Sequence, residues 1–100
     1  MCGRYSLAKE SVEVTVGTHR VGRQGKARYN IAPTQLAPVI RRNAQNLVID
    51  ELRWGLIPEW SRDEAVGFSL INARSETLAE KPAFRTAFRS RRCLIIADGF

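Results

Sequence analysis

Residues 36–54 read LAPVIRRNAQNLVIDELRW. Two stretches that begin with apolar residues and each contain a Val-Ile pair, 36–42 and 47–54, flank the turn-forming tetrapeptide NAQN at residues 43–46. Stretches of this length separated by turn-forming residues are typical of a β-hairpin. We therefore predict two strands joined by a turn at residues 43–46, with Trp54 in the core.

The chain before this hairpin is less decisive. Residues 6–16 leave two alternatives open, because Ser6 can cap a helix while three valines alternate with polar residues as they would in a strand. Residues 17–28 hold three glycines and several basic side chains, which predicts a mobile loop. We expect His19 to be a residue of this loop rather than a ligand or a base.

The chain after the hairpin predicts short elements. Residues 75–79 are compatible with one helical turn, and Pro82 suits the first turn of a following helix. Residues 93–97 read CLIIA, a short apolar run that predicts a buried strand in which Cys93 packs. Strands interspersed with short helices indicate an α+β domain.

Composition bounds the class of protein. One hundred residues make at most one domain, and 44% apolar residues are typical of a globular protein. No apolar run is long enough for a membrane span, there is no secretory signal, and two distant cysteines predict neither a disulfide framework nor a metal site. We expect a reduced, cytoplasmic protein that has no membrane partner.

The charge points to a polyanionic partner. Sixteen basic residues against ten acidic ones give a net charge of +6, and thirteen of the sixteen are arginine. The planar guanidinium pairs with phosphate through two parallel hydrogen bonds. A solvated basic surface without a partner is the alternative, and charge alone does not separate DNA from RNA or from an acidic protein.

Cys2 carries distinctive chemistry once Met1 is removed, as expected before a small second residue. The chain then begins with a 1,2-aminothiol, and unperturbed α-amines and thiols have pKa values of about 7.7–8.0 and about 8.5. The amine condenses with an aldehyde to a Schiff base, and the thiol closes a five-membered thiazolidine. The alternative is that Cys2 is an incidental residue near a terminus.

Five short stretches carry a resemblance to a known family. They are MCGRY at 1–5, RYNIAPTQ at 28–35, WGLIPEW at 54–60, INARSET at 71–77 and ADGF at 97–100. In this order and spacing the chain resembles the SRAP family, the SOS response-associated peptidases or abasic site processing proteins. The resemblance extends over the whole chain.

The resemblance implies a specific activity. Family members lose Met1 by self-cleavage or to an aminopeptidase, and the new N-terminal cysteine forms a thiazolidine crosslink with abasic sites in single-stranded DNA. It implies a role in the DNA damage (SOS) response, with neither metal nor organic cofactor, in a monomer that is cytoplasmic and nucleoid-associated when bound to DNA. The alternatives are a thiol autopeptidase, or a remnant that binds single-stranded DNA without catalysis.

Two positions match the active site of the family. Cys2 matches the nucleophile, through both its amine and its thiol. Asn72 matches an asparagine that hydrogen-bonds around the cysteine and the opened sugar, and its amide can both donate and accept. The alternative for Asn72 is a side chain that caps the turn before Ser75.

Five further positions match family residues that contact DNA. The arginines flank the lesion at phosphates, Asn30 and Pro33 lie in a loop that lines the cleft, and the tryptophan stacks on bases; the set is Arg4, Asn30, Pro33, Trp60 and Arg74. Surface ion pairing, for instance between Arg74 and Glu76, is the alternative for the arginines. Burial in the core is the alternative for Trp60.

The resemblance also implies the fold and the extent of the domain. It predicts a twisted, barrel-like β core flanked by short helices, with residues 1–100 as the N-terminal portion of a single SRAP domain. The family pattern continues past the position of Phe100 with a catalytic glutamate, and later with a histidine. We therefore expect the barrel to be incomplete at the C-terminus, and His19 lies too early in the order of motifs to replace that histidine.

Overall fold

The predicted hairpin is the centre of the computed structural model, which describes residues 2–100. Strands β5 (Leu36–Asn43) and β6 (Asn46–Arg53) pair antiparallel, with Ile40 opposite Ile49. A two-residue turn joins them, and its first residue, Ala44, has a φ of 56°. The inner part of β5 is buried, which fits its apolar run.

A second hairpin occupies the region predicted to be mobile. Strands β2 (Ser11–Val16) and β3 (His19–Gln24) pair along their whole length, so the strand alternative for residues 6–16 is correct from residue 11 onward. The mobile loop over residues 17–28 was a wrong prediction, and His19 belongs to β3. Gly17, with a φ of 62°, supplies the tight two-residue turn that this hairpin requires.

Packing explains why β3 is a strand despite its glycine, Gly22, and its charged side chains. Alternate residues of β3 are half-buried, and the strand lies against β6. The imidazole Nε2 of His19 lies 3.1 Å from the carbonyl oxygen of Gln45 in the neighbouring β5–β6 turn. A partner strand therefore orders a segment whose composition alone predicts flexibility.

The core lies where the short strands β1 (Tyr5–Leu7) and β4 (Arg28–Ile31) meet the start of β5. Leu7, Ile31 and Ala37 form a cluster with exposed fractions of 2%, 0% and 3%. Trp54 packs against this cluster but is only partly buried. The prediction of Trp54 as a core residue therefore holds in part.

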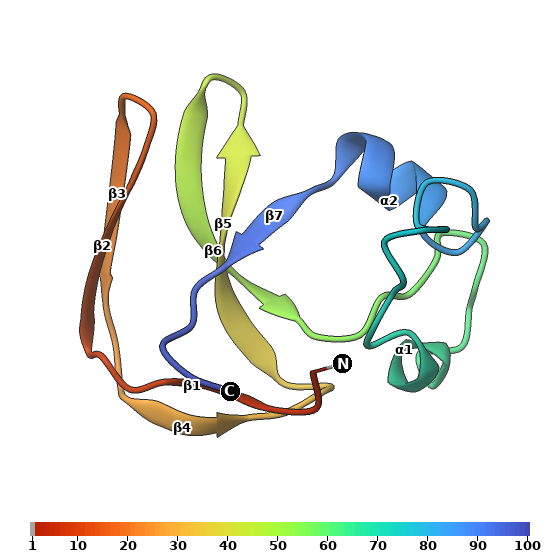
Figure 1. The fold of residues 1–100 in the computed structure, drawn as a ribbon, viewed down its shortest axis with the longest axis horizontal. Coiled ribbons are helices and arrows are strands. Elements are labelled where there is room, and N and C mark those ends of the chain that lie inside the picture. Colours follow the sequence, from red (N-terminus) through yellow and green to blue (C-terminus); the bar gives the residue numbers. More distant parts are fainter. Residues whose placement is uncertain (1) are drawn as a thin grey trace.

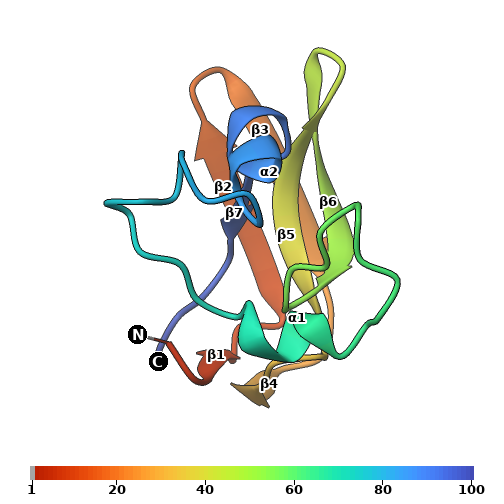
Figure 2. The ribbon, with the colours of Figure 1, turned by 90° about the vertical axis from the view of Figure 1, so that its right-hand side faces the viewer.

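The C-terminal half of the chain contains little regular structure. It forms α1 (Val66–Ser69), α2 (Arg85–Ser90) and β7 (Cys93–Ile95), and both helices lie on the same side of the β5–β6 hairpin (Figures 1 and 2). Residues 75–80 form turns instead of the predicted helical turn. Pro82 lies in a turn before α2 and is not its first residue.

Strand β7 was predicted correctly as a strand but wrongly as a buried one. It pairs antiparallel with β5, and all three of its residues are exposed. Within the described residues β7 has a strand neighbour on one side only, because the sheet order is β6-β5-β7. An apolar sequence does not ensure burial when only one side of a strand is paired.

The strands form three antiparallel sheets, ordered β1-β4, β2-β3 and β6-β5-β7. Closure of a barrel requires pairing that continues around every strand, and the strands within residues 2–100 do not close in this way. The barrel-like core is therefore not confirmed, whereas an α+β fold is compatible with this mostly β architecture. In the described part of the chain no helix is long and apolar enough to cross a membrane.

Candidate functional site

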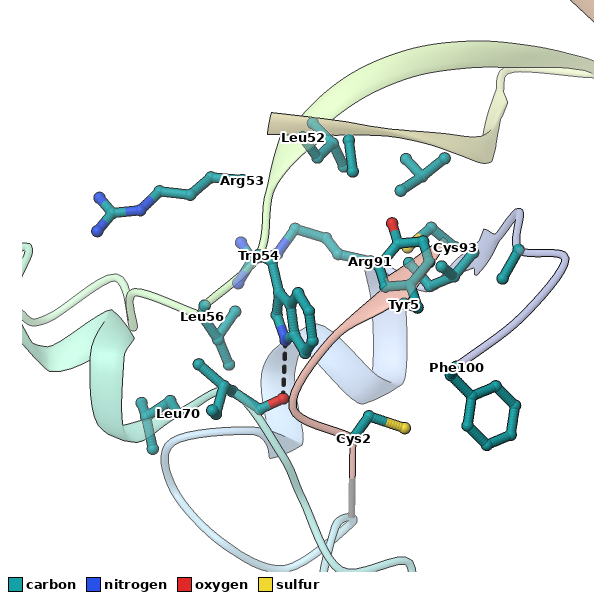
Figure 3. A pocket seen from close by; sticks show the side chains of 16 residues that line it. Cys2, Tyr5, Leu52, Arg53, Trp54, Leu56, Leu70, Arg91, Cys93 and Phe100 are labelled. Carbon is teal, nitrogen blue, oxygen red and sulfur yellow. Dashed lines mark hydrogen bonds between the residues drawn. The ribbon is translucent and has the colours of Figure 1, made fainter. Parts of the chain in front are cut away.

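A cavity of about 510 Å³ lies between the β5–β6 hairpin, β1 and the C-terminal segment. Its wall is largely apolar and includes Tyr5, Trp54 and Leu70, as Figure 3 shows. The two cysteines of the chain, Cys2 and Cys93, both line it and are both free thiols. The N-terminal segment and β7 therefore line the same cavity.

The side-chain amide of Asn72 forms two hydrogen bonds with the main chain of Cys2. The backbone N–H of Cys2 donates to Oδ1 of Asn72 at 3.1 Å, and Nδ2 of Asn72 donates to the carbonyl oxygen of Cys2 at 3.0 Å. These atoms belong to residues 70 positions apart in the sequence. The structure thus brings together the two residues that the sequence predicted as catalytic.

Trp54 places Asn72 at this point. Its indole N–H donates to the carbonyl oxygen of Ile71 at 3.0 Å, the contact drawn as a dashed line in Figure 3. The indole also packs against Tyr5, with ring centroids 5.6 Å apart and planes at 54°. One tryptophan therefore fixes the residue before Asn72 and touches the strand that follows Cys2.

Asp98 anchors the N-terminal segment a few residues after Cys2. Its carboxylate accepts hydrogen bonds from the hydroxyl of Ser6 at 2.9 Å and from the backbone N–H groups of Ala8 and Lys9 at 2.7 and 3.1 Å. The Ser6 hydroxyl, followed by these backbone donors, lowers the pKa of the Asp98 carboxyl. Asp98 lies in the ADGF motif, but the sequence alone indicates no role for it, since its partners are more than 88 residues away.

The thiol of Cys93 faces a different environment. Although the residue as a whole is exposed, burial against the cavity raises the pKa of the Cys93 thiol. Burial also raises the pKa of the neighbouring Tyr5 hydroxyl, whereas the positive charge of Arg28 opposes this effect. Burial therefore disfavours the ionised form of both groups.

The predicted DNA-contacting residues occupy several places. Arg4 and Arg74 are exposed, and neither forms an ion pair with another residue in the range 2–100, so the predicted alternative of an Arg74–Glu76 pair is not seen. Asn30 is exposed on β4, and Pro33 is half-buried two residues after the end of that strand. Trp60 is 69% exposed, which excludes the core alternative.

The structure does not gather all of these residues around Cys2. Arg4 lies two residues from Cys2 and lines a smaller hollow of about 270 Å³ beside the main cavity. The other four predicted DNA contacts are not among the residues that line the main cavity. In the part of the chain that the structure describes, no cluster of histidine, cysteine or acidic side chains could hold a metal ion.

Fold and site together define a β-rich protein that presents a cysteine near its N-terminus, clamped by an asparagine amide, at an apolar cavity. The family profile described as SOS response associated peptidase (SRAP) matches residues 1–100. The chain belongs to this family, as its motifs indicated.

Relatives with curated names resemble the whole chain. The abasic site processing proteins YoqW and YoaM of Bacillus subtilis (strain 168) are 41% and 42% identical over 104 residues, which cover 100% of this chain and 46% of each relative. The abasic site processing protein HMCES of Mus musculus is 30% identical over 125 residues, covering 100% of this chain and 35% of that protein. The chain thus spans less than half the length of these relatives. No solved structure shows a significant match.

Proposed function

We propose that the chain processes abasic sites in single-stranded DNA by forming a thiazolidine crosslink through Cys2. The observation that carries this proposal is the pair of hydrogen bonds that clamps the main chain of Cys2 to Asn72 beside an apolar cavity. Membership of the SRAP family and the names of the relatives support the same function.

The reaction begins with hydrolysis of the Met1–Cys2 peptide bond. It consumes one water molecule, releases methionine and converts the backbone nitrogen of Cys2 into an α-amine; Met1 itself lies outside the described residues. The nitrogen freed in this way is the atom that already contacts Oδ1 of Asn72. Asn72 therefore orients the nucleophile before the DNA arrives.

The crosslink then forms in two steps. The amine adds to the aldehyde carbon of the ring-opened deoxyribose and expels one water molecule, which leaves a Schiff base. The sulfur of Cys2 adds to the same carbon, and the thiol proton moves to the nitrogen, so that one water molecule is lost per crosslink. Closure is intramolecular, and well-oriented intramolecular reactions reach effective molarities of about 10⁵ M or more.

The charge of the chain supports a DNA partner. The net charge is +6, and Arg4 and Arg74 are exposed without a carboxylate partner among residues 2–100. We assign these two arginines to phosphates on either side of the lesion. Asn30, Pro33 and the exposed ring of Trp60 are further DNA contacts in this proposal, since base stacking on an aromatic side chain contributes about 1–3 kcal/mol.

Intact mass spectrometry tests the proposal directly. Wild-type protein incubated with single-stranded DNA that carries one abasic site is expected to lack methionine and to give an adduct that survives denaturation. Cys2→Ser retains the amine but has no thiol, so its adduct should survive only after reduction with borohydride. Cys93→Ser is the matched control, because Cys93 lines the same cavity and is expected to be dispensable.

The alternatives make different predictions in the same assay. A non-catalytic DNA-binding remnant would show reversible, strongly salt-dependent binding with no covalent product, whether or not Cys2 is present. A thiol autopeptidase acting on proteins would turn over added peptides. Absence of a wild-type adduct, or loss of the adduct in Cys93→Ser, contradicts the proposed chemistry.

A further inference from the structure

A β-bulge lies directly beside the N-terminal segment. Tyr5 pairs with Ile31 and Leu7 pairs with Arg28, so two residues of β4, Tyr29 and Asn30, lie opposite the single residue between Tyr5 and Leu7 on β1. Bulges of this kind bend a strand and redirect its side chains, and they are over-represented next to active sites.

The bulge turns an aromatic side chain away from the core. In a regular strand, Tyr29 would share the face of Ile31, because residues two apart point the same way. Ile31 is 0% exposed, whereas Tyr29 is 75% exposed. The irregular register therefore presents a tyrosine ring to solvent that regular pairing would direct towards the core.

This ring lines the smaller hollow of about 270 Å³, together with Arg4 and Phe100. The floor of the hollow is tightly built: the backbone N–H of Ser6 donates to the carbonyl oxygen of Gly99 at 2.7 Å. A Cβ atom on Gly99 would lie 2.9 Å from the hydroxyl oxygen of Ser6, so any larger residue would displace that hydroxyl.

The hollow adjoins the cavity of Cys2. Tyr5 and Phe100 line both of them, and in Figure 3 the sulfur of Cys2 points to the side on which Phe100 lies. An exposed aromatic ring with a free arginine beside it offers a stacking surface and a phosphate contact within one site. A single nucleotide next to the one held at Cys2 would supply both the base that stacks on the ring and the phosphate that pairs with the arginine.

We propose that the hollow is a subsite for the nucleobase adjacent to the abasic nucleotide, which stacks on Tyr29 while its phosphate pairs with Arg4. This inference rests on the proposed function for the position of the lesion. Tyr29 thus becomes a DNA contact that the sequence alone does not indicate, and it provides a physical basis for recognising the neighbouring base. Stacking tolerates all four bases, because each has an aromatic face.

Fluorescence anisotropy with the 100-residue chain tests the subsite independently of crosslinking. The probe is a single strand that contains tetrahydrofuran, an unreactive abasic analogue. Tyr29→Ala should raise Kd by about 5- to 150-fold, the range expected for loss of one base–aromatic stack. Tyr29→Phe should stay within about twofold of wild type because it keeps the ring. Phe68→Ala is the matched control, because Phe68 is an exposed aromatic residue on α1 that lines neither the cavity of Cys2 nor the smaller hollow.

A second tetrahydrofuran in place of one neighbouring base completes the test. On the flank that occupies the subsite, this change should remove the difference between wild type and Tyr29→Ala. Equal Kd values for wild type and Tyr29→Ala on the original strand would overturn the proposal. So would a difference in Kd between them that persists on both strands with a second tetrahydrofuran, whichever neighbouring base is missing. Binding that depends on Tyr29, together with no crosslink to a true abasic site, would support the subsite and contradict the covalent function.

Discussion

Replacement of Asn72 by alanine removes both hydrogen bonds that hold the main chain of Cys2. A typical intramolecular hydrogen bond contributes about 0.5–1.5 kcal/mol, and these two are accessible to solvent, so we expect a loss of about 1–2 kcal/mol of positioning free energy. At about 1.4 kcal/mol per factor of ten, this corresponds to a crosslinking rate about 5- to 30-fold lower. The rate is measured from the growth of the denaturation-resistant adduct under single-turnover conditions.

Two controls separate positioning from general damage. Reaction of Asn72→Ala with a small sugar aldehyde such as glyceraldehyde should proceed at nearly the wild-type rate, because the aminothiol itself is intact. Asn72→Asp keeps an oxygen acceptor but adds a negative charge beside the new amine, which favours the protonated amine and raises its pKa. The rising limb of its pH–rate profile should therefore move to higher pH. A crosslinking rate of Asn72→Ala equal to that of wild type would refute the clamp as a positioning device.

Three further predictions concern the surroundings of the site. Asp98→Asn should lower the Tm at neutral pH, because an amide cannot accept every hydrogen bond that the carboxylate accepts. The lowered pKa of Asp98 stabilises the fold above the ordinary aspartate value of 3.8, and this stabilisation is lost as pH falls through the folded-state pKa, so the Tm difference should vanish in strong acid. Gly55→Ala, at a φ of 122° and with its Cβ 2.5 Å from a backbone oxygen of α1, should lower the Tm by about 8 °C or more, whereas Gly3→Ala meets no atom within 4 Å and should not change it. Alkylation of Cys93 by iodoacetamide, measured in Cys2→Ala, should be slower at neutral pH than that of a free thiol, because burial raises the thiol pKa; a rate equal to that of a free thiol would show that the thiol is fully solvated.

Sequence patterns predict the elements of the fold whose interacting residues lie close together in the chain. The β5–β6 hairpin was predicted because two apolar runs and a polar turn lie next to each other in the sequence. The β2–β3 hairpin was missed in part, because its second strand has little apolar character and is ordered by pairing with β2 and packing against β6. The exposure of β7 depends on how many neighbours a strand has, and composition does not contain that information.

The candidate site likewise has features that the sequence determines and contacts that only the tertiary structure determines. The identity of Cys2 as a potential aminothiol and the family of the chain follow from the sequence, because position in the chain and the order of motifs are properties of the sequence itself. The pairing of Cys2 with Asn72, the hydrogen bond from Trp54 to Ile71 and the anchoring of β1 by Asp98 join residues far apart in the chain. Their geometry exists only after the strands have paired.

The sequence by itself thus determined which chemical groups are present, that the chain is basic, and which family it belongs to. The tertiary structure alone decided which of these groups meet, and that the bulge in β4 turns Tyr29 outwards. The physical reason is that chemical identity is carried by single residues, whereas contacts between distant residues depend on strand register. A shift of one residue in register reverses the face on which every side chain of a strand lies.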